Sequence, residues 1–190
     1  MPYPNYGKID AEDIEAVIAY VRSLEPIATE IEASKPDFLV NLIMGILPLK
    51  AGLTKCPPAS DAIAYGKYLV TASACADCHT QFENGSYTGK PLAGGRSFLF
   101  PDGSVLTSAN LTPHETRLKN WCKLQFIERI KMYEDPEHIR KLNPGEMQTI
   151  MPWAMYAGMT TTDLAAIFDY LQSLEPVENA VTKFLAKEDS

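Results

Sequence analysis

The sequence predicts a mainly helical fold, and three observations support that class. Two stretches, 10–24 and 160–174, repeat apolar residues at the spacing of one helix face. A cap-like Asp61 opens a third helical stretch that runs to about Ala72. The chain lacks the alternation of strands and helices that marks a βαβ unit. The two apolar faces are Ile14, Val17, Ile18, Val21 and Leu24, and Leu164, Ile167, Phe168, Leu171 and Leu174.

The N-terminal part predicts one capped helix followed by a linker. Asp10 caps the first helix, which ends before Pro26. A helix of this length is marginal in water when isolated, so we expect its apolar face to seek burial. The segment that follows is rich in prolines, which indicates a linker between domains. Within it, the apolar run from Phe38 to Leu47 is expected to form a short helix or a strap.

The helix after Asp61 contains Gly66, which costs roughly 1 kcal/mol relative to alanine in a helix interior. A close contact with the C-terminal helix near Tyr170 would explain this glycine. Residues 80–111 form a glycine-rich loop region, in which 98–106 predict a small hairpin around a tight turn. Such a loop can wrap a flat cofactor closely.

The last third of the chain predicts further short elements. Asn120 or Cys122 opens a helix that reaches Tyr133, and a shorter turn follows Pro136. Asn143-Pro144-Gly145 breaks the chain again, and the final helix is capped by Thr160.

Composition excludes several classes of protein. The chain has 190 residues with 46% hydrophobic and 22% charged residues, typical of a globular protein with one domain, or one domain and a fragment of another. The formal net charge of -7 argues against a nucleic-acid surface and favours a basic docking partner. The most apolar run, Phe38 to Leu49, is shorter than the roughly 20 residues that cross a bilayer, so we expect no transmembrane helix.

Residues 1–27 repeat residues 151–177 without a gap, with ten identical positions. The shared residues include Met-Pro at the start and Ser-Leu-Glu-Pro at the end, which lie partly outside the apolar helix face. We interpret this as an internal duplication. The predicted organisation is a C-terminal remnant of a first domain at 1–27, a linker at 28–60 and a second domain at 61–190. The chain is then expected to begin at the tail of the first domain.

The sequence Cys75-Ala76-Asp77-Cys78-His79 is a Cys-x-x-Cys-His motif, which indicates covalent attachment of a c-type haem. Two thiols three positions apart can each add to one vinyl group, and the adjacent imidazole then meets the iron. A zinc half-site and a thiol redox pair are the alternatives. For zinc, only scattered residues offer a second pair of ligands: Cys56, Cys122, His114 and His138.

A haem iron bound by one histidine needs a sixth ligand, and four methionines lie in the region where one is expected. The internal repeat distinguishes them, because only Met151 has a methionine, Met1, opposite it. Pro152 fixes an extended loop that suits the presentation of a thioether. Met159, by contrast, is expected to fill the core. With His79 and Met151 both bound, the iron has no open position, and the predicted function is electron transfer rather than catalysis. The other two candidates are Met147 and Met155.

Other residues support weaker predictions. Haem propionates require hydrogen-bond donors. Four side chains are candidates either for this role or for a role in packing: Arg96, Trp121, Trp153 and Tyr156. His114 and His138 are expected to be solvated surface residues. Cys56 and Cys122 form a disulfide or remain unrelated thiols.

These motifs together resemble the class I cytochrome c family, and more closely the multi-haem cytochromes c that serve membrane dehydrogenases and respiratory chains. The matching segments are 66–70, 75–80, 94–98, 108–113 and 151–156, within about 60–177. The resemblance implies an all-α fold around one haem c, with thioethers from Cys75 and Cys78 and axial ligands His79 and Met151. It also implies a periplasmic or membrane-associated electron carrier between a donor dehydrogenase and an acceptor such as a terminal oxidase. The full-length protein would carry a second haem and an export signal, neither of which this sequence contains.

Two rival functions remain open. One is a haem enzyme or sensor, similar to a peroxidase, with a labile sixth ligand. The other is a zinc or thiol redox module without haem.

Overall fold

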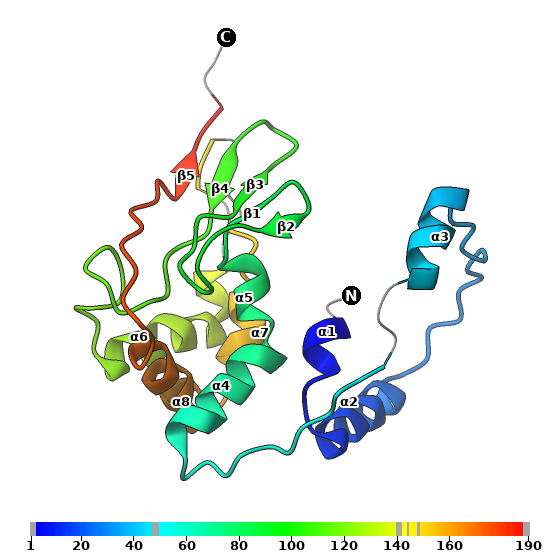
Figure 1. Cartoon of the computed structure of the whole chain (residues 1–190), viewed down its shortest axis with the longest axis horizontal. Helices are drawn as coiled ribbons and strands as arrows, with labels where there is room; N and C mark the ends of the chain where they lie inside the picture. The colour runs from blue at the N-terminus through cyan, green and yellow to red at the C-terminus, as the bar shows by residue number, and fades with distance from the viewer. Residues whose placement is uncertain (1–2, 47–49, 140–141, 144, 148, 188–190) are drawn as a thin grey trace. The chain divides into compact units, whose positions relative to one another are not determined.

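The computed structural model describes residues 3–46, 50–139, 142–143, 145–147 and 149–187. It is mostly helical, with 41% helix and 8% strand, which confirms the predicted class. The all-α class is confirmed in this coarser form, and two small sheets accompany the helices. The chain divides into two compact units, residues 1–56 and 57–190 (Figure 1). The division into 1–27, 28–60 and 61–190 stays a prediction.

The unit of residues 57–190 has a helical core with short strands around it. Its helices are α4 (Ala62–Ala72), α5 (Cys75–Cys78), α6 (Lys123–Lys131), α7 (Trp153–Ala157) and α8 (Thr161–Gln172). Two single turns, η1 (Met132–Glu134) and η2 (Pro136–His138), follow α6. Its strands are β1 (Phe82–Glu83), β2 (Ser86–Tyr87), β3 (Ser97–Leu99), β4 (Val105–Thr107) and β5 (Phe184–Leu185).

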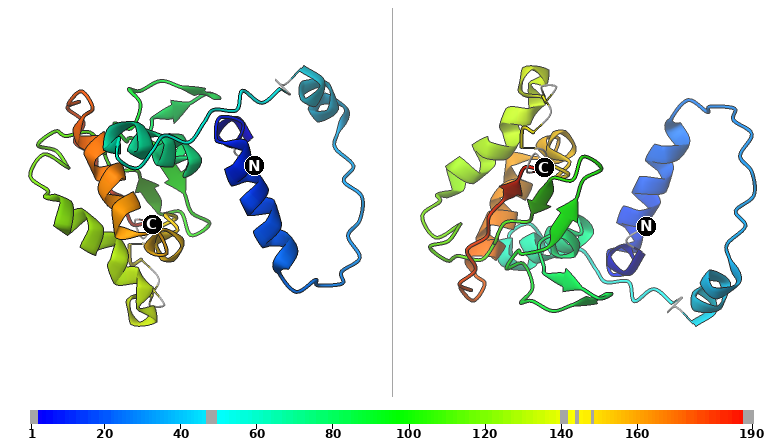
Figure 2. Two further views of the ribbon diagram at one scale, coloured as in Figure 1. Left: turned by 90° about the horizontal axis from the view of Figure 1, so that it is seen from below. Right: turned by 90° about the horizontal axis from the view of Figure 1, so that it is seen from above.

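Helices α4 and α8 pack against each other and form the centre of this unit (Figure 2). A Cβ at Gly66 would lie 2.0 Å from the Ala166 carbonyl oxygen and 2.9 Å from Tyr170 Cβ, so the predicted close contact is confirmed. The buried cluster between the elements is Val70, Leu92, Leu118, Ile130, Leu164, Ile167 and Leu171. The apolar face predicted for the last helix is therefore the core face of α8.

The predicted helix caps of this unit are confirmed. Asp61 accepts a hydrogen bond from the Ala64 N–H at 3.1 Å. Thr160 and Asp163 form a reciprocal capping box at the start of α8. Cys122 is the N-cap of α6, and Pro136 opens η2. The break predicted at Asn143-Pro144-Gly145 includes Pro144, which lies outside the described residues.

The predicted hairpin is also confirmed. Strands β3 and β4 pair antiparallel, with Phe98 opposite Leu106, and Gly103 adopts a φ of 88° in the turn between them. Strand β5, after the last helix, adds to the other edge of β4, with Phe184 opposite Leu106. Neither β5 nor the β1–β2 pair follows from the local sequence pattern, because strands of two residues are too short to show a period.

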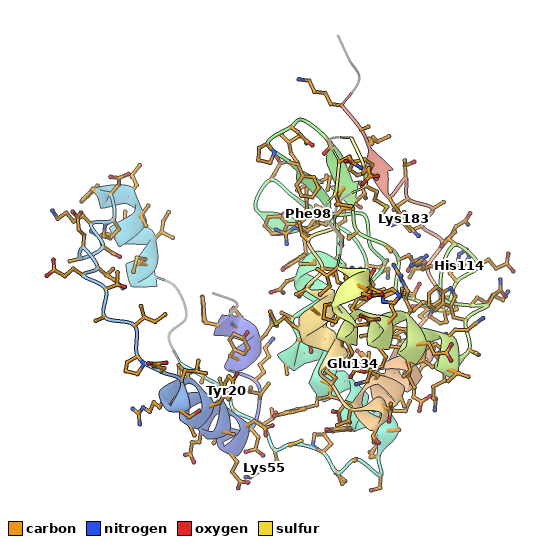
Figure 3. All side chains as sticks on the ribbon, turned by 180° about the vertical axis from the view of Figure 1, so that it is seen from behind. Tyr20, Lys55, Phe98, His114, Glu134 and Lys183 are labelled. Atoms are coloured by element: carbon orange, nitrogen blue, oxygen red, sulfur yellow. The ribbon has the colours of Figure 1, made fainter. Side chains whose placement is uncertain are left out.

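The unit of residues 1–56 contains α1 (Tyr3–Tyr6), α2 (Ala11–Ser23) and α3 (Phe38–Ile46). The short helix expected at 38–47 is confirmed, although Leu47 lies outside the described residues. The apolar face of α2 is not buried as expected: Val17 is 57% exposed and Val21 58%. Tyr20 also projects from α2 and is 67% exposed (Figure 3). No helix in the described residues is long and apolar enough to cross a membrane.

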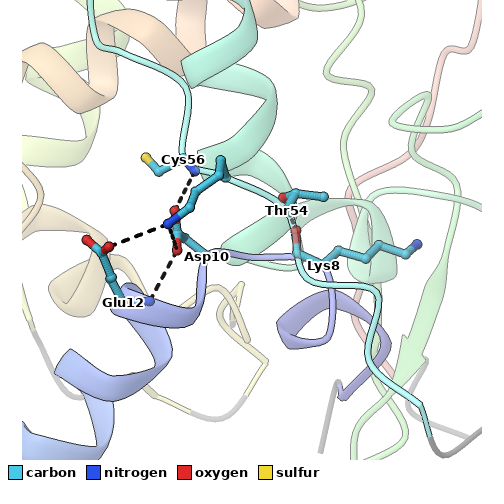
Figure 4. Close-up of polar contacts among 6 residues, drawn as sticks. Lys8, Asp10, Glu12, Thr54 and Cys56 are labelled. Atoms are coloured by element: carbon cyan, nitrogen blue, oxygen red, sulfur yellow. Dashed lines mark hydrogen bonds and ion pairs between the residues drawn. The ribbon is translucent and has the colours of Figure 1, made fainter.

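The carboxylate of Asp10 binds several groups within the N-terminal unit (Figure 4). Its carboxylate caps α2 by accepting from the Glu12 N–H at 3.2 Å, and it also accepts from the Cys56 N–H at 2.9 Å. Lys55 forms an ion pair with the same carboxylate at 3.4 Å. These donors, with the Cys56 and Glu12 amides first, lower the pKa of Asp10 below its ordinary value. The end of the proline-rich segment therefore folds back onto the start of α2.

Candidate haem site

The attachment motif forms a single helical turn, α5, that follows directly on α4. Ala74 precedes the turn in a left-handed conformation, with a φ of 54°, and so reverses the chain sharply. The His79 N–H donates to the Cys75 carbonyl at 2.9 Å and closes the turn. Cys75 packs against the buried cluster, whereas Cys78 is exposed, and both are free thiols. One turn therefore presents two thiols and an imidazole together.

The His79 ring is held by a distant part of the chain. Its Nδ1 lies 2.7 Å from the Ala109 carbonyl oxygen. Since a carbonyl only accepts, Nδ1 carries the proton and Nε2 has its lone pair available for a metal. Burial lowers the pKa of His79, the bond to Ala109 opposes this shift, and the charge of Arg117 adds to it. The lowered pKa favours the neutral imidazole, which is the form that metal ligation requires.

A pair of glycines positions Ala109 beside the histidine. The Gly94 N–H donates to the His79 carbonyl at 2.8 Å, and the Gly95 N–H donates to the Ser108 carbonyl at 2.9 Å. Gly94 has a φ of 75°, and a Cβ there would lie 2.5 Å from the Ala109 carbonyl carbon. Only glycine permits this approach. The loop expected to wrap a cofactor therefore holds the proposed iron ligand.

The two thiols differ in environment. Burial raises the pKa of Cys75 to about 12. Partial burial of the thiol also raises the pKa of Cys78, although the positive charge of Arg96 opposes the shift. Arg96 donates to the Asp77 carbonyl inside α5, and its guanidinium lies 4.7 Å from the Phe82 ring centre and 5.2 Å from that of Phe98. Arg96 thus stabilises the attachment turn.

The other predicted propionate donors have partners within the chain. Trp153 Nε1 donates to Thr149 Oγ1 at 3.3 Å, and the Tyr156 hydroxyl donates to the Ser73 carbonyl at 2.9 Å. The second bond joins α7 to the residues immediately before α5. The guanidinium of Arg117 lies over Trp121, and its Cζ is 5.2 Å from the centre of the Trp121 ring.

The four candidate methionines occupy different environments. Met155 is 77% exposed and Met147 is 51% exposed. Met159 packs against the buried cluster, as expected of a core residue. Met151 is half-buried, and its backbone is fixed on both sides: its N–H donates to Thr149 Oγ1 at 3.2 Å, and its carbonyl accepts from the Trp153 N–H at 2.8 Å.

The remaining cysteines and histidines add no ligands to the motif. No described cysteine is in a disulfide. His138 is exposed, as expected, and its Nδ1 lies 3.7 Å from Asp135 Oδ2. His114 is half-buried, with Nδ1 3.2 Å from Thr116 Oγ1. Among the described residues, no three His, Cys, Asp or Glu side chains gather as a metal site.

The sequence analysis missed Arg117. Its Nε is buried without a hydrogen-bond partner in the part of the chain that the structure describes. A buried cationic donor without an acceptor is costly, and it suits an anionic group bound nearby. The two thiols, the available Nε2 of His79 and this unsatisfied nitrogen all fit a haem. An arginine in a loop has no local pattern that signals such a role.

The sequence of the chain is similar to those of known proteins. The family model for cytochrome c matches residues 63–175. The chain is 31% identical to the cytochrome c subunit of an alcohol dehydrogenase (quinone) from Gluconacetobacter polyoxogenes, over 93% of this chain and 40% of the relative. It is 28% identical to the cytochrome subunit of a fructose dehydrogenase from Gluconobacter japonicus, over 72% of this chain and 27% of the relative. The chain is 27% identical to the cytochrome c subunit of a gluconate 2-dehydrogenase from Pantoea cypripedii, over 75% of this chain and 30% of the relative. The chain thus spans less than half the length of these relatives.

Proposed function

The chain belongs to the cytochrome c family, and from that premise we propose that it is a single-electron carrier with a haem bound by Cys75, Cys78, His79 and Met151. Cys75 and Cys78 form the thioethers, and His79 and Met151 are the axial ligands. When bound, a haem c supplies a reversible one-electron Fe(III)/Fe(II) couple. Because the protein fills both axial positions, neither oxygen nor peroxide binds, and the chain transfers electrons rather than catalysing a reaction.

The hydrogen bond from His79 Nδ1 to the Ala109 carbonyl is the observation that carries this proposal. It selects the tautomer that ligates through Nε2, and it orients the ring while α5 holds the two thiols. The fixed backbone of Met151 supports the choice of the second ligand, because a thioether on an anchored loop loses less conformational freedom on binding.

The partners are proposed from the relatives, which are named as cytochrome subunits of fructose, alcohol and gluconate dehydrogenases. The donor of electrons to this chain is then a dehydrogenase subunit, and the acceptor is a respiratory component such as a terminal oxidase. The chain contains one attachment motif, so we assign it one haem c. The setting is periplasmic or otherwise extracytoplasmic.

Spectra of the protein expressed with export and a haem-attachment system test the proposal. Wild type should contain one covalent haem by pyridine haemochrome, with the sulfur-to-iron charge-transfer band of a low-spin His/Met haem. Met151→Ala should lose this band, bind carbon monoxide and show a lower reduction potential. Met155→Ala is the matched control, because the same truncation at an exposed position should leave the spectrum unchanged.

Three outcomes would contradict the proposal. If Met155→Ala or Met159→Ala abolishes the band and Met151→Ala does not, the axial ligand is wrong. If no covalent haem forms and Cys75 and Cys78 react with a thiol reagent, the motif belongs to a zinc or thiol site instead. If wild type itself binds carbon monoxide readily, a haem enzyme or sensor replaces the electron carrier.

A further inference from the structure

The segment that follows α8 returns to the loop that holds the His79 ring. Residues 174–185, which we call the β5 segment, end in β5, and β5 pairs with β4 at the edge opposite β3 (Figure 1). The Thr107 N–H also donates to the Lys183 carbonyl at 2.8 Å. Since β4 ends at Thr107, the chain runs directly from this pairing to Ala109, whose carbonyl accepts from His79.

Asn110, the residue after Ala109, joins this loop to the β5 segment. It is 1% exposed, and its Nδ2 donates to the Val177 carbonyl at 2.7 Å and to Thr116 Oγ1 at 3.1 Å. Its Oδ1 accepts from the Thr112 N–H at 2.9 Å and from Thr112 Oγ1 at 2.7 Å. The Val177 carbonyl can only accept and the Thr112 N–H can only donate, so these partners fix the orientation of the amide. Every hydrogen-bonding position of this buried amide is therefore used.

Thr112 connects the same two segments a second time. It is also 1% exposed, and its Oγ1 accepts from the Val177 N–H at 3.1 Å while it donates to Asn110 Oδ1. Val177 thus binds the loop through both its N–H and its carbonyl. The three residues form a closed ring of hydrogen bonds. Because each member orients the next, loss of one hydroxyl should loosen the whole ring.

Asn179, also in the β5 segment, secures the backbone that packs against Ala109. Its Nδ2 donates to the Ala93 carbonyl at 2.9 Å. That carbonyl belongs to the planar peptide that ends at the Gly94 nitrogen. A Cβ on Gly94 would lie 2.5 Å from the Ala109 carbonyl carbon. The β5 segment therefore holds both sides of the closest backbone approach beside the histidine.

We propose that the β5 segment, through Asn110 and Thr112, positions the Ala109 carbonyl against His79 Nδ1 and so tunes the reduction potential of the haem. This inference rests on the proposed function, since it needs His79 to ligate the iron. The Ala109 carbonyl lies in the planar peptide that ends at the Asn110 nitrogen, so fixing Asn110 fixes the direction of that carbonyl. Asn110 and Thr112 are positioning residues, because they act through the carbonyl rather than on the iron.

The direction of the effect follows from the chemistry of the histidine. A carbonyl that accepts from Nδ1 increases the basicity of Nε2. A more basic ligand stabilises Fe(III) over Fe(II), because the ferric ion carries the higher charge. A well-placed Ala109 carbonyl therefore lowers the reduction potential, and hydrogen bonding to an axial ligand is one of the ways in which a protein sets that potential. Loosening the ring of hydrogen bonds should raise it.

Thr112→Val and Thr112→Ser separate this role from packing. Thr112→Val keeps the shape of the side chain but removes the hydroxyl, so in the haem-containing protein it should raise the potential measured by spectroelectrochemistry. The Hδ1 resonance of His79 in the NMR spectrum of the reduced protein should move upfield, and this proton should exchange faster with water, because its bond to the carbonyl is weaker. Thr112→Ser keeps the hydroxyl and removes a buried methyl group. It should lower the midpoint of urea denaturation but leave the potential and the Hδ1 resonance at their wild-type values.

Thr182→Val is the matched control, because it makes the same substitution in the β5 segment at an exposed residue. Its potential and Hδ1 resonance should match those of wild type. If Thr112→Val does not fold, Asn179→Ala tests the other side of the loop and should also raise the potential. A wild-type potential and resonance in every folded variant of Thr112→Val and Asn179→Ala would refute the positioning role.

Two other outcomes would also overturn the proposal. Equal shifts in Thr112→Val and Thr112→Ser would assign the effect to packing rather than to the hydroxyl. A raised potential with an unchanged Hδ1 resonance would show that the ring of hydrogen bonds acts on the haem by a route other than His79.

The test separates this inference from the proposed function. Loss of covalent haem in wild type, or an unchanged spectrum in Met151→Ala, contradicts the proposed function before any variant of the β5 segment is compared. A Thr112→Val protein with covalent haem, an intact charge-transfer band and the wild-type potential contradicts the positioning role alone.

Discussion

Gly66→Ala tests whether the packing of α4 on α8 sets the stability of the haem-binding unit. The new Cβ would lie 2.0 Å from the Ala166 carbonyl oxygen, and ordinary contact begins at 3.4 Å, so the helices must separate by 1.4 Å at their crossing. The obstructing atom belongs to the backbone of α8, so no side-chain rotation can relieve the overlap.

Two effects of opposite sign determine the size of the change. Alanine gains about 1 kcal/mol over glycine in a helix interior. Overpacking of a well-packed core costs about 1–3 kcal/mol, and overlap with a backbone atom places this case at the upper end. Separation of the helices also loosens the contacts of Val70 with the buried cluster, which includes Leu164 and Leu171. We therefore expect a net loss of about 2 kcal/mol in the free energy of unfolding.

Urea denaturation of the haem-containing protein measures this loss. The chain has two tryptophans, Trp121 and Trp153, and both lie in the unit of interest, so their fluorescence reports its unfolding. With an unchanged slope of about 2 kcal/mol/M, the midpoint should fall by about 1 M. The pair Lys67→Gly and Lys67→Ala is the control, because it measures helix propensity at the exposed neighbouring position. A midpoint for Gly66→Ala at or above that of wild type would refute the packing argument.

Two further predictions concern the loop beside His79 and the N-terminal unit. Gly94→Ala places a Cβ 2.5 Å from the Ala109 carbonyl carbon at a φ of 75°, so it should cost about 2–4 kcal/mol in unfolding free energy and disturb the His79 ring. Shifted histidine resonances in the NMR spectrum of the haem protein would show the second effect, and unchanged ones would contradict it. The carboxylate of Asp10 has a lowered pKa in the folded state, so its stabilisation is present above pH 3.8 and is lost as the pH falls through the lowered value. Asp10→Asn should speed amide exchange at Cys56 at neutral pH and remove this acid dependence; equal exchange in both proteins would exclude the Asp10 anchor.

Local sequence patterns predicted most of the elements of the fold. The helices α2, α3, α4, α6 and α8 follow from apolar spacing and caps, because both are properties of adjacent residues. The hairpin followed from its turn residues at 101–103. The prediction failed for β5, since the pairing of Phe184 with Leu106 joins segments nearly 80 positions apart. It also failed for the exposed apolar face of α2, because periodicity indicates an apolar face but not what covers it.

By itself, the sequence indicated the attachment motif with its histidine and favoured Met151 among four methionines, because a covalent motif and a repeat are properties of residue order. Only the tertiary structure decided how the ring of His79 is held. The Ala109 carbonyl reaches it from 30 positions away, and Gly94 makes room for that approach. Likewise, only the fold buries Arg117 Nε without a hydrogen-bond partner among the described residues. Backbone carbonyls look alike in every sequence, and the burial of a side chain depends on chain packing, so neither leaves a local pattern.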